Sequence, residues 1–129
     1  TNAKESGYEI IYIVTGENAK LFRDRFQNFS GLEIKFATQY IPKDREKPLG
    51  TADAVLQAME QFTELQHEPF SVCNSDNLYS VNAFGALTKS RASNALIAYS
   101  IRALEFTQDR LRNFAVLEFN TQDHLMNIT

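Results

Sequence analysis

The residues best suited to chemistry in this sequence form one polar cluster around Asp76. The stretch PFSVCNSDNLYS, residues 69–80, begins with a short apolar run and continues into Asn74, Ser75, Asp76 and Asn77. A carboxylate at such a place can bind Mg²⁺, a hard cation that prefers oxygen ligands and is usually held by one or two carboxylates together with substrate phosphates. The same residue types are also the commonest turn formers, because their side chains bond nearby backbone groups. The stretch alone therefore leaves a metal site and a plain turn open.

Composition limits the classes of protein to which the chain can belong. With 129 residues, 43% of them hydrophobic and 22% charged, it has enough apolar material for one core, and we expect one domain over residues 1–129. A net charge of -3 and a pI near 5.4 argue against a nucleic-acid partner. No apolar run approaches the roughly 20 residues that a membrane span requires. Because the single cysteine cannot form an internal disulfide, a reducing, cytoplasmic location fits.

Strand and helix patterns alternate along most of the chain. Thr51 is expected to cap one of the helices, and Asp53 in its first turn suits the positive end of the helix dipole. The alternation predicts an α/β fold with a Rossmann-like, mostly parallel sheet, helices on both faces and a C-terminal β-hairpin. The patterns predict strands over residues 8–14, 32–38, 70–73 and 95–101, helices over residues 17–29, from 51 onward and over 82–89, and a hairpin from residues 114–119 and 124–128.

Ligands of parallel α/β sheets bind outside the carboxyl ends of the strands. Three segments are predicted to meet there: Thr15 and Gly16, the loop over residues 39–50, and residues 74–79. The loop contains two prolines, a glycine and five charges, which excludes regular structure. Asp76 would thus reach the rim of the sheet where a metal-bound phosphate is expected.

Two stretches in this order resemble the sugar-1-phosphate nucleotidylyltransferase family. A GTA at residues 50–52 opens a helix, and an Asp-Asn pair at Asp76 follows about 25 residues later, as in the family's G-T/L-A and G/S-D-N motifs. The segment SGYEIIYIVTG is similar to the family's second core strand, and residues 114–128 look like the hairpin that precedes its Glu-Lys-Pro motif. The resemblance covers nearly all of the chain.

The resemblance implies roles for five positions. Gln39 matches the glutamine that reads the nucleotide base, and Gly50 matches a glycine whose backbone lies against the base, for which a missing Cβ is required. Thr51 is placed with them in the nucleotide site, and Asp76 matches the Mg²⁺-binding aspartate. Ala115 stands where many relatives have a glycine beside the sugar, which puts the identity of the sugar in doubt. The alternatives are an exposed loop amide for Gln39 and a simple loop-to-helix turn for Gly50.

The implied reaction joins a nucleoside triphosphate and a sugar-1-phosphate to give a nucleotide-sugar and pyrophosphate. It requires Mg²⁺, in-line positioning and cancellation of negative charge rather than a covalent protein intermediate. The family's first strand with its Gly-rich loop is expected before Thr1 and its Glu-Lys-Pro element after Thr129, so the sequence reads as a partial catalytic domain. Alone, this piece is expected neither to fold stably nor to catalyse.

Two other functions fit the same fold. The first is a catalytically inactive relative that binds nucleotide-sugars as a regulatory or assembly subunit, and it would lack the cations of the Gly-rich loop. The second is a choline-phosphate cytidylyltransferase, which would need an anionic or aromatic pocket for a quaternary amine. The nucleobase, the sugar and the oligomeric state cannot be read from the sequence.

Overall fold

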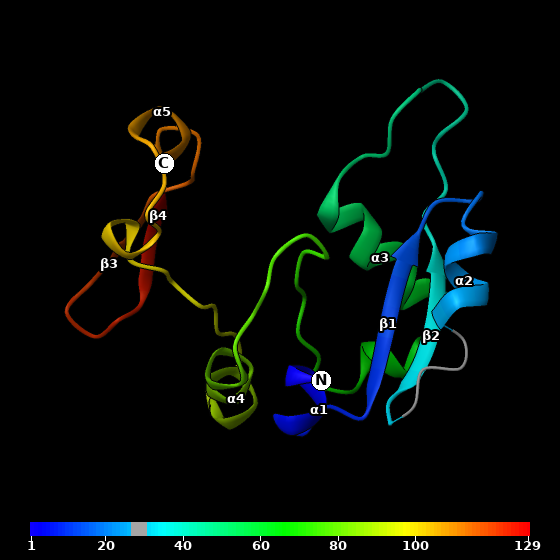
Figure 1. The fold of residues 1–129 in the computed structure, drawn as a ribbon, viewed down its shortest axis with the longest axis horizontal. Helices are drawn as coiled ribbons and strands as arrows, with labels where there is room; N and C mark the ends of the chain where they lie inside the picture. The colour runs from blue at the N-terminus through cyan, green and yellow to red at the C-terminus, as the bar shows by residue number, and fades with distance from the viewer. Residues whose placement is uncertain (27–30) are drawn as a thin grey trace. The chain divides into compact units, whose positions relative to one another are not determined.

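A computed structural model describes residues 1–26 and 31–129 of the chain (Figure 1). It divides into two compact units, which are described separately: unit 1, Thr1–Arg91, and unit 2, Ala92–Thr129. The single domain expected over residues 1–129 stays a prediction.

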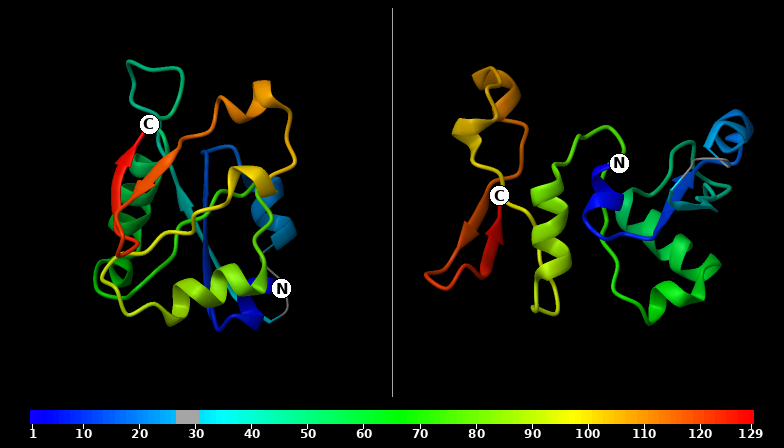
Figure 2. Two further views of the ribbon diagram at one scale, coloured as in Figure 1. Left: turned by 90° about the vertical axis from the view of Figure 1, so that its left-hand side faces the viewer. Right: turned by 60° about the horizontal axis from the view of Figure 1, so that its bottom comes forward.

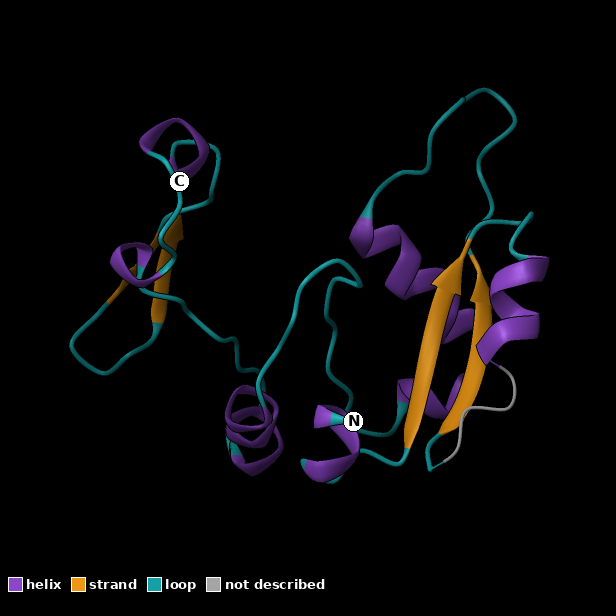
Figure 3. Cartoon of the chain, viewed as in Figure 1, coloured by secondary structure: helices purple, strands orange, loops and turns teal. Residues whose placement is uncertain are grey.

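Figure 3 colours the elements by type. Unit 1 contains α1 (Asn2–Glu5), β1 (Ile10–Thr15), α2 (Lys20–Phe26), β2 (Glu33–Thr38), α3 (Thr51–Gln61), the 3-10 helix η1 (Thr63–Gln66) and α4 (Val81–Lys89); unit 2 contains the 3-10 helix η2 (Ile101–Ala103), α5 (Gln108–Leu111), β3 (Leu117–Phe119) and β4 (Leu125–Ile128).

Unit 1 is built on a parallel pair of strands. β1 and β2 pair in register from Ile10 opposite Glu33 to Thr15 opposite Thr38. α2 and α3 lie on opposite faces of this pair (Figures 1 and 2). The predictions of two parallel strands and a mixed α/β fold are therefore confirmed, with strand ends shifted by one or two residues.

Small residues bring α3 close to the sheet. Ala37 of β2 is completely buried, and Ala58 of α3 is 4% exposed in the same cluster, together with Leu65 of η1. Tyr12 and Val14 of β1 pack against this cluster. Two alanines at the contact leave little side-chain volume between helix and strand, so the polar side chains of α3 can reach the backbone of β2.

Two glutamines of α3 bond the outer edge of β2. Gln39 N donates to Thr15 O at 2.8 Å, so the backbone groups of Thr38 and Tyr40 point away from β1. The Gln61 amide accepts from Thr38 N at 2.9 Å and donates to Thr38 O at 2.8 Å. The Gln57 amide does the same for Tyr40, at 2.8 and 3.1 Å. These side chains thus take the place of a neighbouring strand at this edge.

A polar cluster fixes η1 to the sheet. Glu64 Oε1 accepts hydrogen bonds from Lys35 Nζ and from Tyr12 Oη, both at 2.8 Å. The Lys35 ammonium also lies 5.3 Å from the centre of the Tyr12 ring. The bond from Lys35, with further bonds from the backbone of Glu64 and from Tyr12, lowers the pKa of the Glu64 carboxyl from 4.5 to about 2.

The strands predicted over residues 70–73 and 95–101 are wrong, since neither segment is in a β-ladder. A strand requires a neighbour that receives its backbone bonds, and the described residues provide none for these segments. Phe70, Val72 and Cys73 are exposed rather than buried. In the second segment a local turn is formed instead, because Ala103 N donates to Ser100 O at 2.9 Å and η2 begins at Ile101.

The predicted helices are present with corrected ends. α2 begins at Lys20 rather than at residue 17, and Phe29, at its expected end, lies outside the described residues. Thr51 does not cap α3: it is the first helical residue, and Gly50 is the N-cap. Gly50 has φ 116° and ψ -170°, a conformation that excludes side-chain-bearing residues such as threonine. Asp53 lies in the first turn, as predicted.

The hairpin predicted at the end of the chain is confirmed in unit 2. β3 and β4 are antiparallel, with Leu117 opposite Ile128 and an irregularity between Glu118 and Phe119. The Asn120 side chain accepts from the backbone of Gln122 and His124, both at 2.9 Å, and so shapes the turn.

Among the described residues, no helix is both long enough and apolar enough to cross a bilayer.

Replacing Gln61 tests the closure of the β2 edge. In Gln61→Leu the full-length protein loses both bonds to Thr38, and we expect the free energy of unfolding to fall by about 1–2 kcal/mol, as two net hydrogen bonds contribute. Urea unfolding followed by circular dichroism measures this. Glu60→Leu, on the exposed face of the same helix, is the matched control. Equal losses in both variants would contradict the role of the amide.

Acid titration tests the Glu64 cluster. Because the folded pKa is about 2 and the ordinary value is 4.5, the stabilisation is complete above about pH 4.5 and is lost as the pH falls toward 2. Glu64→Gln should remove this part of the pH dependence of the unfolding midpoint. Glu60→Gln is the control, because the Glu60 carboxylate bonds no described residue. An unchanged pH profile in Glu64→Gln would show that the cluster does not contribute.

Candidate functional site

The candidate site lies where β1 and β2 end and α3 begins. Gln39 directly follows β2, and its backbone N–H is bonded to Thr15 at the end of β1. Its half-buried side chain donates from Nε2 to Gly50 O at 3.1 Å and to Asp53 Oδ2 at 2.7 Å. The loop over residues 40–49 leaves the sheet after Gln39 and returns at Gly50, without regular structure, as predicted. The two ends of this loop are thus joined by one side-chain amide.

Gly50 is required by its backbone rather than by crowding. Its φ of 116° lies in a region that side-chain-bearing residues rarely adopt, whereas an added Cβ would meet no atom within 4 Å. This conformation directs Gly50 O toward the Gln39 amide at the start of α3. Thr51 follows as an exposed residue on the first turn of the helix. Gln39, Gly50 and Thr51 are therefore brought together, and the space in front of Gly50 is open.

Asp53 connects Gln39 to α3. Its Oδ2 accepts from Gln39 Nε2 at 2.7 Å and from Gln57 Nε2 at 2.9 Å. Gln57 is itself bonded to both backbone groups of Tyr40. The orientation of Gln39 therefore depends on α3, through a carboxylate that lies where the helix dipole favours a negative charge.

Asp76 lies in an exposed turn that is fixed by a tyrosine. Asn77 N donates to Asn74 O at 3.4 Å, and Tyr79 Oη accepts from Asn74 N at 3.2 Å and from Asn77 Nδ2 at 3.3 Å. The Asp76 carboxylate bonds none of the described residues, so its oxygen atoms are accessible to a ligand. The turn and a metal role are therefore compatible with each other.

The structure joins two of the three segments that were predicted to meet. Thr15 and Gln39 are hydrogen-bonded neighbours at the carboxyl ends of the parallel strands. The connection that carries Asp76 runs on the side of β1 away from β2 (Figures 1 and 2). Among the described residues, no hydrogen bond or ion pair links Asp76 to Gln39 or Gly50. Ala115 belongs to unit 2, where it is exposed just before β3.

The donor set around Asp76 fits a cation that is held mainly by its substrate. Among the described residues there is no group of three histidine, cysteine or acidic side chains that could bind a metal ion without other ligands. Mg²⁺ usually takes one or two carboxylates from a protein when phosphate oxygens and water complete its shell, and Asp76 offers one. Asp76 therefore fits a Mg²⁺ ion whose other ligands come from substrate phosphates and water.

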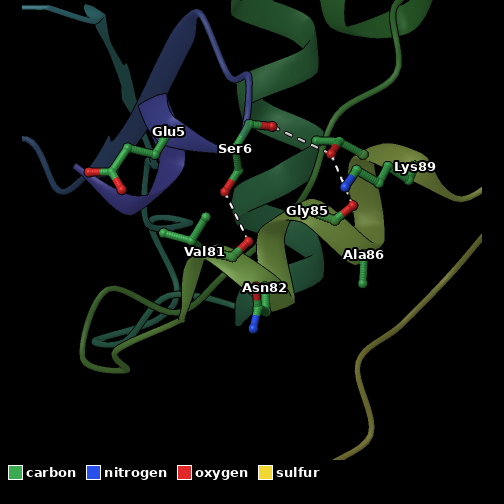
Figure 4. Close-up of a pocket in the computed structure, with 8 residues that line it drawn as sticks. Glu5, Ser6, Val81, Asn82, Gly85, Ala86 and Lys89 are labelled. Atoms are coloured by element: carbon green, nitrogen blue, oxygen red, sulfur yellow. Dashed lines mark hydrogen bonds between the residues drawn. The ribbon is translucent and has the colours of Figure 1, made fainter.

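A hollow of about 420 Å³ lies between α1 and α4, away from these residues (Figure 4). Ser6 Oγ donates to Val81 O at 3.0 Å, and Thr88 Oγ1 donates to Ser6 O, so these two hydroxyl groups of its wall are already paired. Gln39, Gly50, Thr51 and Asp76 do not line it. The hollow is a gap between two helices rather than a site for the chemistry described above.

The sequence pattern did not predict a functional role for three residues of the site. Asp53 was assigned only to the helix dipole, and Gln57 and Tyr79 were assigned no role. The spacing of Asp53, Gln57 and Gln61, four residues apart, places three polar side chains on one stripe of α3 and was a usable signal. Tyr79 gave no such signal, because the bonds to its hydroxyl depend on the shape of the turn.

Residues 1–128 match the sequence model of a family described as nucleotidyl transferase. No curated protein and no solved structure matches the chain. The matched range contains Gln39, Gly50, Asp53 and Asp76.

Removing the Tyr79 hydroxyl tests the order of the turn around Asp76. In Tyr79→Phe the bond from Asn74 N is lost, and we expect the amide of Asn74 to exchange its hydrogen about five to ten times faster, as one net hydrogen bond implies. Hydrogen exchange followed by NMR measures this. Tyr40→Phe removes an exposed hydroxyl that bonds no described residue, and it should leave the Asn74 amide unchanged. An Asn74 amide that is equally slow in both variants would contradict the assignment.

Proposed function

The chain belongs to the nucleotidyl transferase family, and from this premise we propose that the full-length protein transfers a nucleotidyl group from a nucleoside triphosphate to a sugar-1-phosphate. The products are a nucleotide-sugar and pyrophosphate. The observation that carries the proposal is the Gln39–Gly50 contact at the carboxyl ends of two parallel strands, where α/β proteins bind nucleotides. The larger Rossmann-like sheet with helices on both faces is part of the same proposal.

The nucleotide is proposed to lie against Gly50. The backbone there has no Cβ and is open to its surroundings, so a flat base can approach it closely. Gln39 bonds an edge of the base, and the exposed hydroxyl and N–H groups of Thr51, at the start of α3, are available to the rest of the nucleotide. Ala115 is proposed to lie beside the sugar, where its methyl group is larger than the hydrogen of a glycine.

In the proposed reaction an oxygen of the sugar-1-phosphate attacks the α-phosphorus of the triphosphate. The bond from the α-phosphorus to the oxygen that bridges it to the β-phosphorus breaks, and pyrophosphate leaves with that electron pair. The contribution of the protein is to hold the two substrates in line and to balance their charge. No covalent bond to the chain is formed.

Asp76 is proposed to hold Mg²⁺. When bound, this ion would neutralise negative charge on the phosphates. Its oxygen ligands would be the free carboxylate of Asp76 and the phosphates themselves. The bonds from Asn74 and Asn77 to Tyr79 restrain the turn that presents this carboxylate.

A cytoplasmic location is proposed as well. The sequence has one cysteine, Cys73, which is an exposed free thiol. Free thiols are usual in compartments where cysteines stay reduced.

The direct test is a substrate panel. Pyrophosphate release by the full-length protein is measured with Mg²⁺, nucleoside triphosphates and sugar-1-phosphates. Asp76→Asn should lower the rate by about a hundredfold or more, since it removes charge that is placed for the phosphates. Asp24→Asn, at an exposed acid of α2, is the control and should leave the rate unchanged.

Three results of this experiment would change the proposal. A near-normal rate in Asp76→Asn would remove that residue from the mechanism. Turnover with acceptors other than sugar-1-phosphates would correct the substrate. Tight binding of a nucleotide-sugar without any turnover would favour a catalytically inactive, nucleotide-sugar-binding subunit.

A further inference from the structure

The hydrogen bonds of Gln39 determine which of its side-chain atoms is free. Both donations from Nε2 go to groups that only accept, the carbonyl of Gly50 and the carboxylate of Asp53. Turning the amide over would place Oε1 against two oxygen atoms and would lose both bonds. The amide therefore has one orientation, and Oε1 receives no hydrogen bond from any described residue.

Asp53 is the stronger of the two restraints on this amide. Its bond to Gln39 Nε2 is 2.7 Å, shorter than the 3.1 Å bond to Gly50 O, and a charged acceptor strengthens it further. Asp53 is in turn held by Gln57, which is bonded to the backbone of Tyr40. A continuous set of bonds thus runs from the edge of β2 through α3 and back to the residue that follows β2.

We propose that Asp53 is a positioning residue that acts through Gln39: it binds Nε2 and so presents Oε1 as a fixed acceptor for an N–H group of the nucleobase. The inference rests on the proposed function and deepens it. Gln39 would then distinguish bases by whether they offer a donor at that point. A base with an acceptor at that point would place its lone pair against Oε1 and would form no hydrogen bond. Because the amide is fixed, it cannot turn over to present Nε2 instead.

The alternative role for Asp53 is that of a negative charge, either as a metal ligand or as a partner of the helix dipole. Two substitutions separate these roles. Asp53→Asn removes the charge but keeps an oxygen that can accept from both Gln39 and Gln57. Asp53→Ala removes the charge and the acceptor together. Any effect found in Asp53→Ala but not in Asp53→Asn is therefore due to the loss of the hydrogen bonds rather than of the charge.

The first measurement needs no substrate. The side-chain amide signals of Gln39 are recorded by ¹⁵N–¹H NMR in the full-length protein and are assigned by their loss in Gln39→Ala. In Asp53→Ala we expect these signals to move toward the positions of a free amide, and in Asp53→Asn to stay near those of the wild type. Signals that are the same in Asp53→Ala and the wild type would overturn the positioning role.

The second measurement is base selectivity, taken as the ratio of kcat/KM for the best nucleoside triphosphate to that for the next best. We expect this ratio to fall about tenfold in Asp53→Ala, chiefly through KM, and to stay within about threefold in Asp53→Asn. The double variant Gln39→Ala with Asp53→Ala should be no less selective than Gln39→Ala alone, because Asp53 acts through Gln39. The urea midpoint of Asp53→Ala should lie below that of Asp53→Asn, because alanine removes the acceptor of two hydrogen bonds as well as the charge, so selectivity is compared at a urea-free condition in which both variants are folded.

The outcomes separate this inference from the function on which it rests. An active Asp53→Ala protein with unchanged selectivity overturns the role of Asp53 and leaves nucleotidyl transfer intact. Equal loss of selectivity in the asparagine and alanine variants assigns the effect to charge and also overturns it. A wild-type protein that neither binds nor turns over any triphosphate overturns the proposed function and, with it, the proposed use of Oε1.

Discussion

The contact between the glutamines of α3 and the outer edge of β2 is the interaction on which unit 1 and its candidate site depend. Gln57 and Gln61 each bond both backbone groups of one residue that follows or ends β2. These four bonds set the distance and the rotation of α3 relative to the sheet. They can form only because Ala37 and Ala58 allow helix and strand to approach closely. The packing of small apolar residues and the polar contacts at the edge of β2 therefore depend on each other.

The candidate site follows from the same arrangement. Once α3 is fixed against β2, its first turn lies beside Gln39, and Asp53 reaches the amide. Gly50 completes the arrangement, since its backbone conformation, with φ 116° and ψ -170°, points its carbonyl at the same amide. The orientation of one side chain at the end of a strand is therefore a property of the whole β2–loop–α3 unit rather than of the loop alone.

Local sequence patterns were sufficient for those elements whose partners lie nearby in the chain. The β1–β2 pair, α3 and the hairpin of unit 2 all follow from periodicity and turn residues. The segment over residues 70–73 has the same apolar character, but whether it is a strand depends on a neighbour that its own residues do not specify. The strand prediction for residues 95–101 is wrong for the same reason, and a local turn at Ser100 forms there in place of a β-ladder.

Part of the site could be read from the sequence in the same way. The rule for the carboxyl ends of parallel strands placed the start of the loop, at Gln39, beside Thr15, and the family resemblance placed Gln39 and Gly50 in one nucleotide site. That Asp53 joins them could not be read in this way, because its bond depends on the φ of Gly50 and on the depth at which α3 packs. The turn around Asp76 was readable from its asparagines, whereas the role of the Tyr79 hydroxyl depends on how the chain returns after the turn.

The closure of the β2 edge also has a consequence for the order in which the protein is synthesised. Gln61 lies 23 residues after Thr38, so β2 leaves the ribosome before the side chains that cover it. At about 5–20 residues per second, this interval lasts roughly 1–5 s, during which the outer edge of β2 can accept a foreign strand. A nascent chain stalled between these positions would have the outer edge of β2 uncovered, and chaperone binding would matter most at that stage.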